Sequence, residues 1–291
     1  MGDGFGVPSP GRAFEAHEVA LIALGSATTL ALLAAGQVSN PVILAAVGPT
    51  ILYGSVIFAC RGRTGGGFRI RLLASYGFVV WFYCAVARIT PALGTELRDG
   101  ALLAIDEAIF GQTPAIFCEG LATAWLTDLT SLCYLTYHLY LPVAVVHAAL
   151  IPNISSQRLR VYLFTGFAIG FAGYLLVPAV GPASAFPELF RRPLPGGTPA
   201  RVIAEMVAAG SSGYDVFPSL HVLITCILLD HDWRHVRRRF WMMVVPSLGL
   251  VISTVYLRYH YGMDILAGFL LFLALRQTFL KARRREARMP E

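Results

Sequence analysis

Eight apolar segments, most of them long enough to cross a lipid bilayer, constrain the fold of this chain more than any other feature. They lie at about 19–36, 41–60, 72–87, 121–151, 161–180, 217–231, 241–258 and 262–280. A helix needs about 20 apolar residues to span the roughly 30 Å hydrocarbon core of a membrane. Only 14% of the residues are charged and 56% are hydrophobic, which excludes an ordinary soluble domain. We expect an all-α polytopic membrane helix bundle with about eight transmembrane helices.

Two of these segments are less regular than the others. The 72–87 segment is short, and the 121–151 segment carries Asp128, His138 and His147, so its first part could lie in the membrane interface. For both histidines a packing or hydrogen-bonding role is favoured. The first 17 residues lack the basic start and cleavage site of a signal peptide, so we expect the first span to be retained.

The basic residues predict an orientation. With a cytoplasmic N-terminus, 16 Lys and Arg residues fall on the cytoplasmic side and six on the other side, as the positive-inside rule requires. Both termini would then be cytoplasmic, and residues 281–291 would form a basic cytoplasmic tail. The ratio of 22 Arg to one Lys suggests a GC-rich bacterial genome. We therefore expect a multi-pass protein of the plasma (bacterial inner) membrane.

Two short stretches carry the chemistry. The first is Phe217-Pro218-Ser219-Leu220-His221, in which Ser219 is placed to cap a helix and to leave backbone N–H groups free for an anion beside His221. The second begins at His260, with Asp264 four residues later. On one helix these two side chains would lie about 5–6 Å apart at Cβ, so the carboxylate could orient the imidazole. Both stretches fall on the extracytoplasmic face in the predicted topology.

This pattern is suited to phosphoryl transfer by double displacement. His260 would attack phosphorus, Asp264 would hold its ring, and His221 would protonate the leaving oxygen. A zinc site needs three or four converging ligands, and two histidines with one aspartate fall short of that number. We expect neither a metal nor another cofactor.

Pro218 to His221 resembles the second motif of the type 2 phosphatidic acid phosphatase superfamily, and Ser253 to Asp264 resembles its third. The resemblance covers about 106–270 and implies the three catalytic roles given above. It also implies a six-helix catalytic core, placed here at 106–280, with additional N-terminal helices at 1–90 of a single membrane domain. Thr254 stands where the third motif usually has an arginine, and the lysine of the first motif has no counterpart.

The stretch Asp106 to Pro114 resembles an element of the inositolphosphotransferase branch, which includes the inositol phosphorylceramide synthases. Val180-Gly181-Pro182 fits that branch too. The branch implies transfer of a phosphoryl or phospho-head-group from a lipid donor to a lipid or alcohol acceptor. The alternative is a lipid phosphate phosphatase with water as acceptor. A transporter or a scaffold is less favoured, because the ionisable residues gather at one face and no repeat is visible.

The remaining candidate residues concern substrate binding. Arg258 is the favoured replacement for the missing phosphate clamp, and Ser219 and Tyr256 are further candidates. Asp106 could equally cap an interfacial helix or hold the head group, and Asp215 is more typical of a loop or cap than of a substrate contact. The expected partner is a phospholipid or a polyprenyl or sphingolipid phosphate in the bilayer. Neither nucleic acid binding nor an oligomeric state is predicted.

The helix after the first motif is short for a membrane span. From Ser219 to Asp230 it would measure about 18 Å. Either it continues through Trp233, or the site lies below the membrane surface, which we prefer because a lipid presents its phosphate from within the bilayer. Two long segments, 88–120 and 181–216, would then cover the site, with an interfacial helix near 200–209 and a fixed loop at 182–199.

Overall fold

The computed structural model describes residues 14–61 and 66–286, and every regular element within these ranges is helical. The all-α expectation is confirmed. Eight long elements are α1 (Ala16–Ala34), α2 (Pro41–Ala59), α3 (Gly66–Leu93), α6 (Ala124–Leu150), α7 (Ile154–Leu176), α10 (Leu220–His235), α11 (Arg237–Tyr256) and α12 (Gly262–Glu286). Five short ones are α4 (Asp99–Phe110), α5 (Pro114–Glu119), α8 (Pro182–Ala185), η1 (Pro187–Leu189) and α9 (Thr198–Gly210).

Seven of the long helices within the described ranges are long and apolar enough to cross a membrane, rather than about eight. The exception is α10, whose 16 residues give about 24 Å of helix. It continues through Trp233 to His235, which is the first of the two alternatives given above, and the depth of the site in the membrane stays a prediction. Conversely, α3 has 28 residues and extends beyond 72–87 in both directions. The predicted tail at 281–291 begins as the last helical turns of α12, and 287–291 lie outside the described residues.

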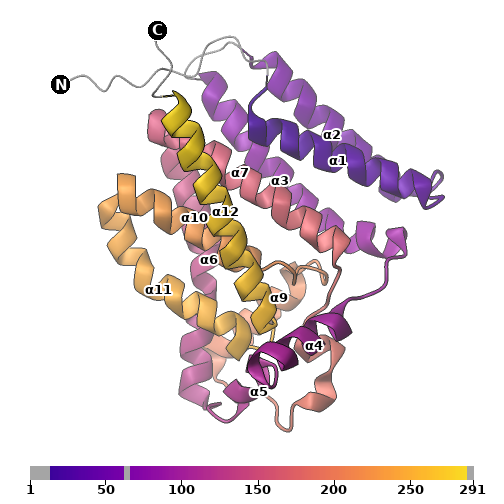
Figure 1. Ribbon diagram of the computed structural model, residues 1–291, viewed down its shortest axis with the longest axis vertical. Coiled ribbons are helices and arrows are strands. Elements are labelled where there is room, and N and C mark those ends of the chain that lie inside the picture. Colours follow the sequence, from indigo (N-terminus) through magenta and orange to yellow (C-terminus); the bar gives the residue numbers. More distant parts are fainter. Residues whose placement is uncertain (1–13, 62–65, 287–291) are drawn as a thin grey trace.

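The centre of the bundle is α7, which packs against α1, α3 and α10 (Figure 1). Its buried face is aromatic: Phe171 stacks on Phe82 of α3 with ring centroids 5.2 Å apart, and Phe164 is fully buried. Beside this core, α6 packs along α11, and α10 contacts both α11 and α12. Large aromatic and aliphatic side chains from helices distant in sequence therefore form the main core cluster.

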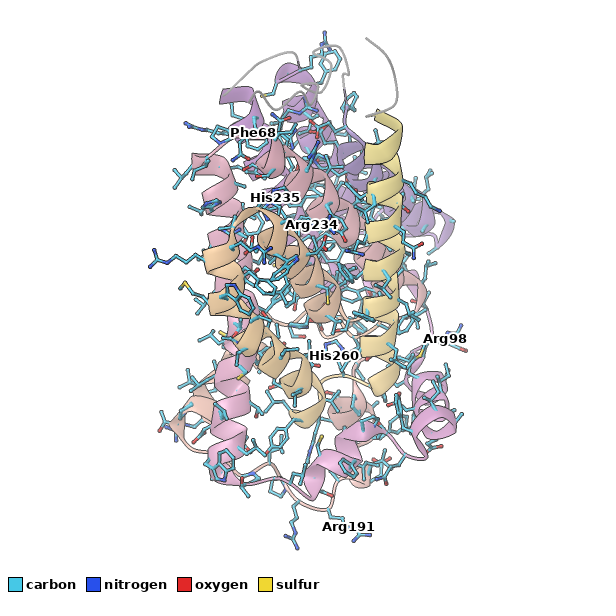
Figure 2. All side chains as sticks on the ribbon, turned by 60° about the vertical axis from the view of Figure 1, so that its left-hand side comes forward. Phe68, Arg98, Arg191, Arg234, His235 and His260 are labelled. Atoms are coloured by element: carbon cyan, nitrogen blue, oxygen red, sulfur yellow. The ribbon has the colours of Figure 1, made fainter. Side chains whose placement is uncertain are left out.

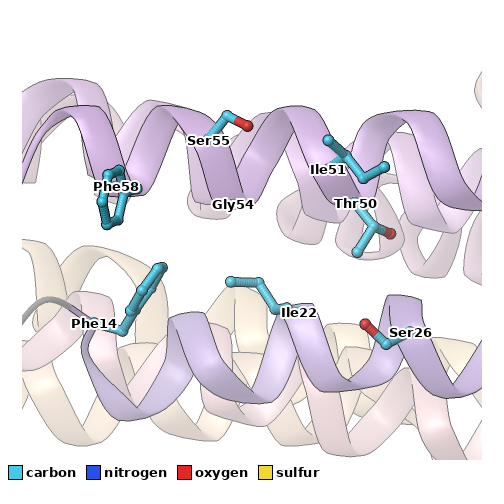
Figure 3. A pocket seen from close by; sticks show the side chains of 8 residues that line it. All are labelled: Phe14, Ile22, Ser26, Thr50, Ile51, Gly54, Ser55 and Phe58. Carbon is cyan, nitrogen blue, oxygen red and sulfur yellow. The ribbon is translucent and has the colours of Figure 1, made fainter.

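Helices α1 and α2 pack side by side at the edge of the bundle. A groove of about 500 Å³ runs between them, lined by Ile22 and Ser26 of α1 and by Ile51 and Phe58 of α2 (Figure 3). The lining contains no charged residue. These two helices belong to the N-terminal set predicted at 1–90.

A buried ionic cluster attaches the N-terminal helices to the core. Arg71 of α3 donates to both carboxylate oxygens of Glu18, and Arg160 of α7 donates to Glu15. His17 is fully buried beside them and stacks on the core. Arg71 and Arg160 are two of the 16 basic residues that the predicted orientation assigns to the cytoplasmic side, but both lie buried inside the bundle. Charges with such close partners can be buried at a tolerable cost.

The same cluster defines one end of the molecule, where α1, α3 and α7 begin. Tyr162 of α7 packs on Phe279 with ring centroids 4.6 Å apart, so the late part of α12 lies there too. The five short elements gather around the opposite end, near the starts of α10 and α12 (Figure 1). Among them, α9 coincides with the helix expected at 200–209, and the loop expected at 182–199 contains α8 and η1.

Candidate active site

The first motif forms the start of α10 as its sequence predicts. Ser219 is the N-cap, and its Oγ accepts from the backbone N–H of Val222 at 3.4 Å. The backbone N–H of Ser219 donates to the carbonyl oxygen of Asp264 at 3.1 Å. The two motifs are thus joined main chain to main chain. His221 follows in the first turn, at the end of the helix where backbone N–H groups favour an anion.

The second motif lies in a turn rather than wholly on a helix. α11 ends at Tyr256, Arg258 has a φ of 66°, and the N–H of His260 donates back to the Thr254 carbonyl at 3.1 Å. His260 therefore precedes α12 by two residues. The expectation that His260 and Asp264 share a helix is wrong. The two side chains meet nevertheless, because the turn folds His260 back over the first turn of α12.

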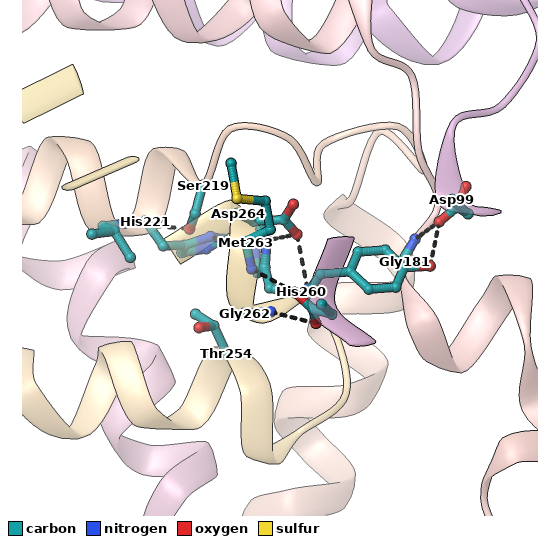
Figure 4. A network of polar contacts seen from close by, with 12 residues as sticks. Asp99, Gly181, Ser219, His221, Thr254, His260, Gly262, Met263 and Asp264 are labelled. Atoms are coloured by element: carbon teal, nitrogen blue, oxygen red, sulfur yellow. Dashed lines mark hydrogen bonds and ion pairs between the residues drawn. The ribbon is translucent and has the colours of Figure 1, made fainter. Parts of the chain in front are cut away.

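The three predicted catalytic side chains form a row (Figure 4). Nδ1 of His260 lies 3.4 Å from Oδ2 of Asp264, and Nε2 of His260 lies 3.3 Å from Nδ1 of His221. With Asp264 ionised, the His260 proton belongs on Nδ1, which leaves a lone pair on Nε2 facing His221. His221 is 8% exposed, His260 2% and Asp264 0%. The row is therefore both aligned and enclosed.

Close helix packing at α12 maintains this alignment. A Cβ at Gly268 would lie 2.6 Å from the carbonyl oxygen of Ser219, so a larger residue would push α12 away from α10. A second close approach is at Gly181, whose φ is +88° and whose Cβ would lie 2.5 Å from the carbonyl oxygen of Tyr259. Glycine alone tolerates both the left-handed backbone and the contact.

Two aspartates of α4 brace the catalytic turn. Asp106 accepts from the backbone N–H groups of Gly262 and Met263 at 2.8 and 2.7 Å, and from the hydroxyl of Thr113. It therefore caps the start of α12, from a different helix 156 residues earlier in the chain. The observed contacts make Asp106 a cap of α12, a candidate membrane span, rather than of an interfacial helix, and a contact of Asp106 with the head group stays a prediction.

The second brace, Asp99, was not anticipated from the sequence. Its carboxylate accepts from the N–H of Gly181 and from the hydroxyl of Tyr261, each at 2.9 Å. Asp99 and Asp106 are seven residues apart, two turns along one face of α4. This seven-residue spacing was the only feature of the sequence that could have indicated a shared role for the two aspartates. The sequence did not show which segment this face of α4 would contact.

We expect Asp106→Ala to destabilise the protein by about 2 kcal/mol or more, because it leaves buried N–H groups at the start of α12 without an acceptor. Turnover should fall as well, since these groups hold the turn that carries His260. Glu107→Ala is the matched control, because Glu107 is the next residue on α4 and is exposed. Thermal unfolding in detergent, followed by activity assays, measures both effects. Equal stability of the two variants would refute the brace.

The predicted clamp, Arg258, contacts other groups in this structure. Its guanidinium donates to the carbonyl of Arg192 at 2.9 Å and to Glu119 at 3.3 Å, and it lies 4.2 Å from the ring centroid of Phe190. Its hydrogen bonds within the described residues do not include His221 or His260. The role of Arg258 as a clamp stays a prediction.

Two further candidates are held by neighbouring polar groups. The hydroxyl of Tyr256 lies 2.9 Å from that of Thr127, and it is buried. Asp215 accepts from the hydroxyls of Tyr83 and Ser211. These contacts do not join either residue to the histidine row.

Aromatic side chains of α6 complete the surroundings of His221. The rings of Tyr134 and Tyr137 have centroids 4.9 and 4.6 Å from that of His221, and Tyr259 packs on Tyr134. Both α6 tyrosines were missed in the sequence, where their three-residue spacing was the only signal. His138 follows on the same helix and packs on both of them.

Binding of a metal ion would need several ligating side chains grouped around one point. Within residues 14–61 and 66–286, no three His, Cys, Asp or Glu side chains are placed to hold a metal ion. The arrangement offers a nucleophilic imidazole, a carboxylate to orient it and a second imidazole to exchange a proton.

Comparison with known proteins gives one family result. The model of the PAP2 superfamily matches residues 100–276, which include both histidine motifs and all of α4 except its first residue, Asp99. No curated protein and no solved structure gives a significant match.

Proposed function

Because the chain belongs to the PAP2 superfamily, we propose that it transfers a phosphoryl or phospho-head-group from a lipid donor to a lipid or alcohol acceptor through a phosphohistidine. The observation that carries this proposal is the row Asp264–His260–His221, with nitrogen atoms 3.3 Å apart between the two imidazoles. The family supports a lipid phosphatase or phosphotransferase in general. The transfer reaction is the finer proposal.

The proposed reaction has two displacements. In the first, Nε2 of His260 forms a bond to phosphorus, the bond from phosphorus to the donor oxygen breaks, and His221 gives that oxygen a proton. In the second, the acceptor hydroxyl gives its proton to His221 and attacks phosphorus, which releases His260. Asp264 stabilises the positive charge that His260 gains. The two rings must part to admit the phosphorus between them.

Burial of the histidines supports transfer over hydrolysis. His260 and His221 are almost wholly covered, and a phosphohistidine in such surroundings is shielded from water. We propose that the acceptor lipid reaches the phosphohistidine from the bilayer once the two rings have parted. Water as acceptor, the phosphatase reaction, remains the alternative within the same mechanism.

The groups around the row favour a singly charged phosphate. Among the described hydrogen bonds and ion pairs, no arginine contacts either catalytic histidine, and Thr254 replaces the family's arginine. A phosphodiester carries less charge than a phosphomonoester. We therefore propose a donor of the phosphoinositol type, as in the inositolphosphotransferase branch.

The deciding experiment is incubation of purified protein with a panel of lipid donors and acceptors. Mass spectrometry then scores both free phosphate and exchanged head groups. Transfer predicts new head-group lipids with little free phosphate. Free phosphate alone would assign the protein to the phosphatases. If no donor lipid gives either product, the proposal is wrong.

The orientation of the site is also a proposal. Arg191 and Arg238 are both exposed, and in Figure 2 Arg191 lies far below Arg234, which is four residues before Arg238 in the chain. If the histidine row faces the extracytoplasmic side, Arg191→Cys should react with an impermeant thiol reagent in intact cells. Arg238→Cys should react only after permeabilisation. The reverse labelling pattern would place the active site in the cytoplasm.

Arg258 provides a further test. As a clamp, it must leave Glu119 to reach the phosphate, so we expect Arg258→Ala to lower kcat/KM by about 10-fold or more through loss of a charge-assisted contact. Glu119→Gln, which frees the guanidinium, should preserve substrate use. An equal loss in both variants, with lower thermal stability, would make Arg258 a structural brace of the segment at 190–192.

A further inference from the structure

A second groove lies away from the histidine row, on the side of α10 between α11 and α12. It has a volume of about 450 Å³. Leu229, Asp230 and Trp233 of α10 line it, with Phe240 of α11 and a row of residues on α12 that comprises Phe272, Leu273 and Arg276. Asp230 is nine residues after His221, or about 14 Å along the helix. In Figure 2, Arg234 next to this groove and His260 lie at clearly different heights.

The groove has an apolar part and a cationic part. Leu229, Trp233, Phe240, Phe272 and Leu273 supply the apolar walls. At the other part, Nη2 of Arg234 and Nε of Arg276 both donate to one oxygen of Asp230 at 2.9 Å. Two guanidinium groups thus share a single carboxylate, which leaves a net positive charge.

Spare hydrogen-bond donors remain at the cationic part. The side chain of Arg276 is 39% exposed, and within the described residues only its Nε is bonded, to Asp230. The side chain of Arg234 is 26% exposed, but its Nε is buried, so only its Nη nitrogens can reach a ligand. The guanidinium of Arg237 lies 3.5 Å from the ring centroid of Trp233 and adds a third positive charge nearby. Guanidinium groups with free planar donors are well matched to phosphate oxygens.

The surface beside the groove is strongly apolar. Trp241 and Val245 of α11 are 64% and 71% exposed, and Leu270 of α12 is 60% exposed. In a chain with seven candidate spans, such surface faces lipid. The groove between α1 and α2 has apolar walls too but lacks charged residues, so it offers no comparable argument.

We propose that the groove of α10, α11 and α12 binds one anionic phospholipid. Its phosphate lies at Arg276 and Arg234, and an acyl chain lies along Phe240, Phe272 and Leu273. The cationic part is at the end of α10 remote from His221, so this lipid enters from the leaflet opposite the catalytic histidines. It is therefore a separate ligand, and its binding does not depend on the proposed reaction.

Native mass spectrometry of the purified full-length protein tests the proposal. Protein is equilibrated with phosphatidylglycerol or with phosphatidylcholine of the same acyl chains, and retained lipid is counted. We expect wild type to keep one phosphatidylglycerol about 10-fold better than phosphatidylcholine. Arg276→Gln should abolish this preference, Arg276→Lys should keep most of it, and Arg201→Gln on α9 is the matched exposed control.

A groove-filling variant keeps the test decisive if Arg276→Gln does not fold. Leu273→Trp should remove retention of both lipids while leaving the histidine row unaltered. Unchanged phosphatidylglycerol binding in either variant would overturn the proposal. So would a raised KM for the donor lipid in Leu273→Trp with phosphatidylglycerol binding intact, because the groove would then hold the substrate's acyl chain.

Discussion

His260→Ala should abolish turnover with every donor lipid, by at least about 10⁴-fold, because it removes the atom that forms the bond to phosphorus. Within the row, His260 is the imidazole whose Nδ1 contacts a carboxylate, that of Asp264. This contact orients the ring and leaves the lone pair on Nε2. In wild type, rapid quenching without acid followed by mass spectrometry should find the phosphorylated residue at His260.

Glu107→Ala is a suitable control, because it alters an exposed side chain near the brace without touching the row. The thermal unfolding midpoint of His260→Ala should stay close to that of wild type. Turnover that persists in folded His260→Ala, with an adduct on another residue or none, would contradict the covalent mechanism.

His221→Ala should slow natural lipid donors by about 10² to 10⁴-fold, the usual range for a lost general acid. An activated phenol needs no proton to leave, so the same variant should process a nitrophenyl phosphodiester at a rate close to that of wild type in its first step. This selectivity follows from the position of His221, whose Nδ1 faces the attacking nitrogen of His260.

Burst kinetics with the nitrophenyl substrate separates the two displacements. In His221→Ala the burst of phenol should remain, and the later transfer to an alcohol should be slow, because the acceptor then lacks its base. An equal loss for both leaving groups would assign His221 to phosphate binding rather than to proton transfer.

The sequence predicted best those features that depend on residues close together in the chain. Apolar runs located the long helices because lipid requires their length, and the four-residue spacing of His260 and Asp264 predicted that these two side chains meet, although not the turn that brings them together. Ser219 was identified as an N-cap because its side chain acts on the next turn of its own helix. Each of these inferences depends on neighbours in the chain.

Contacts between distant segments were beyond such reasoning. Asp99 reaches Tyr261 across 162 residues, and Tyr134 and Tyr137 approach His221 only because α6 passes beside α10. Arg258 has the right sequence position for a clamp, yet its partner Glu119 lies on α5, 139 residues earlier. The ionic cluster at Arg71 and Glu18 could not be predicted for the same reason. An arginine near the end of an apolar segment is assigned to the loop at the membrane surface unless its buried partner is known.

The hydrogen bond from the N–H of Ser219 to the carbonyl of Asp264 has a practical consequence. This bond is made by the main chain, so substitution of the catalytic side chains leaves it intact. The bonds from the N–H groups of Gly262 and Met263 to Asp106 are left intact as well. An inactive His260→Ala protein should keep the shape of the working site. When this variant is purified from its own membrane, we expect the unconverted donor lipid to remain bound to it. Identification of that lipid would reveal the natural substrate.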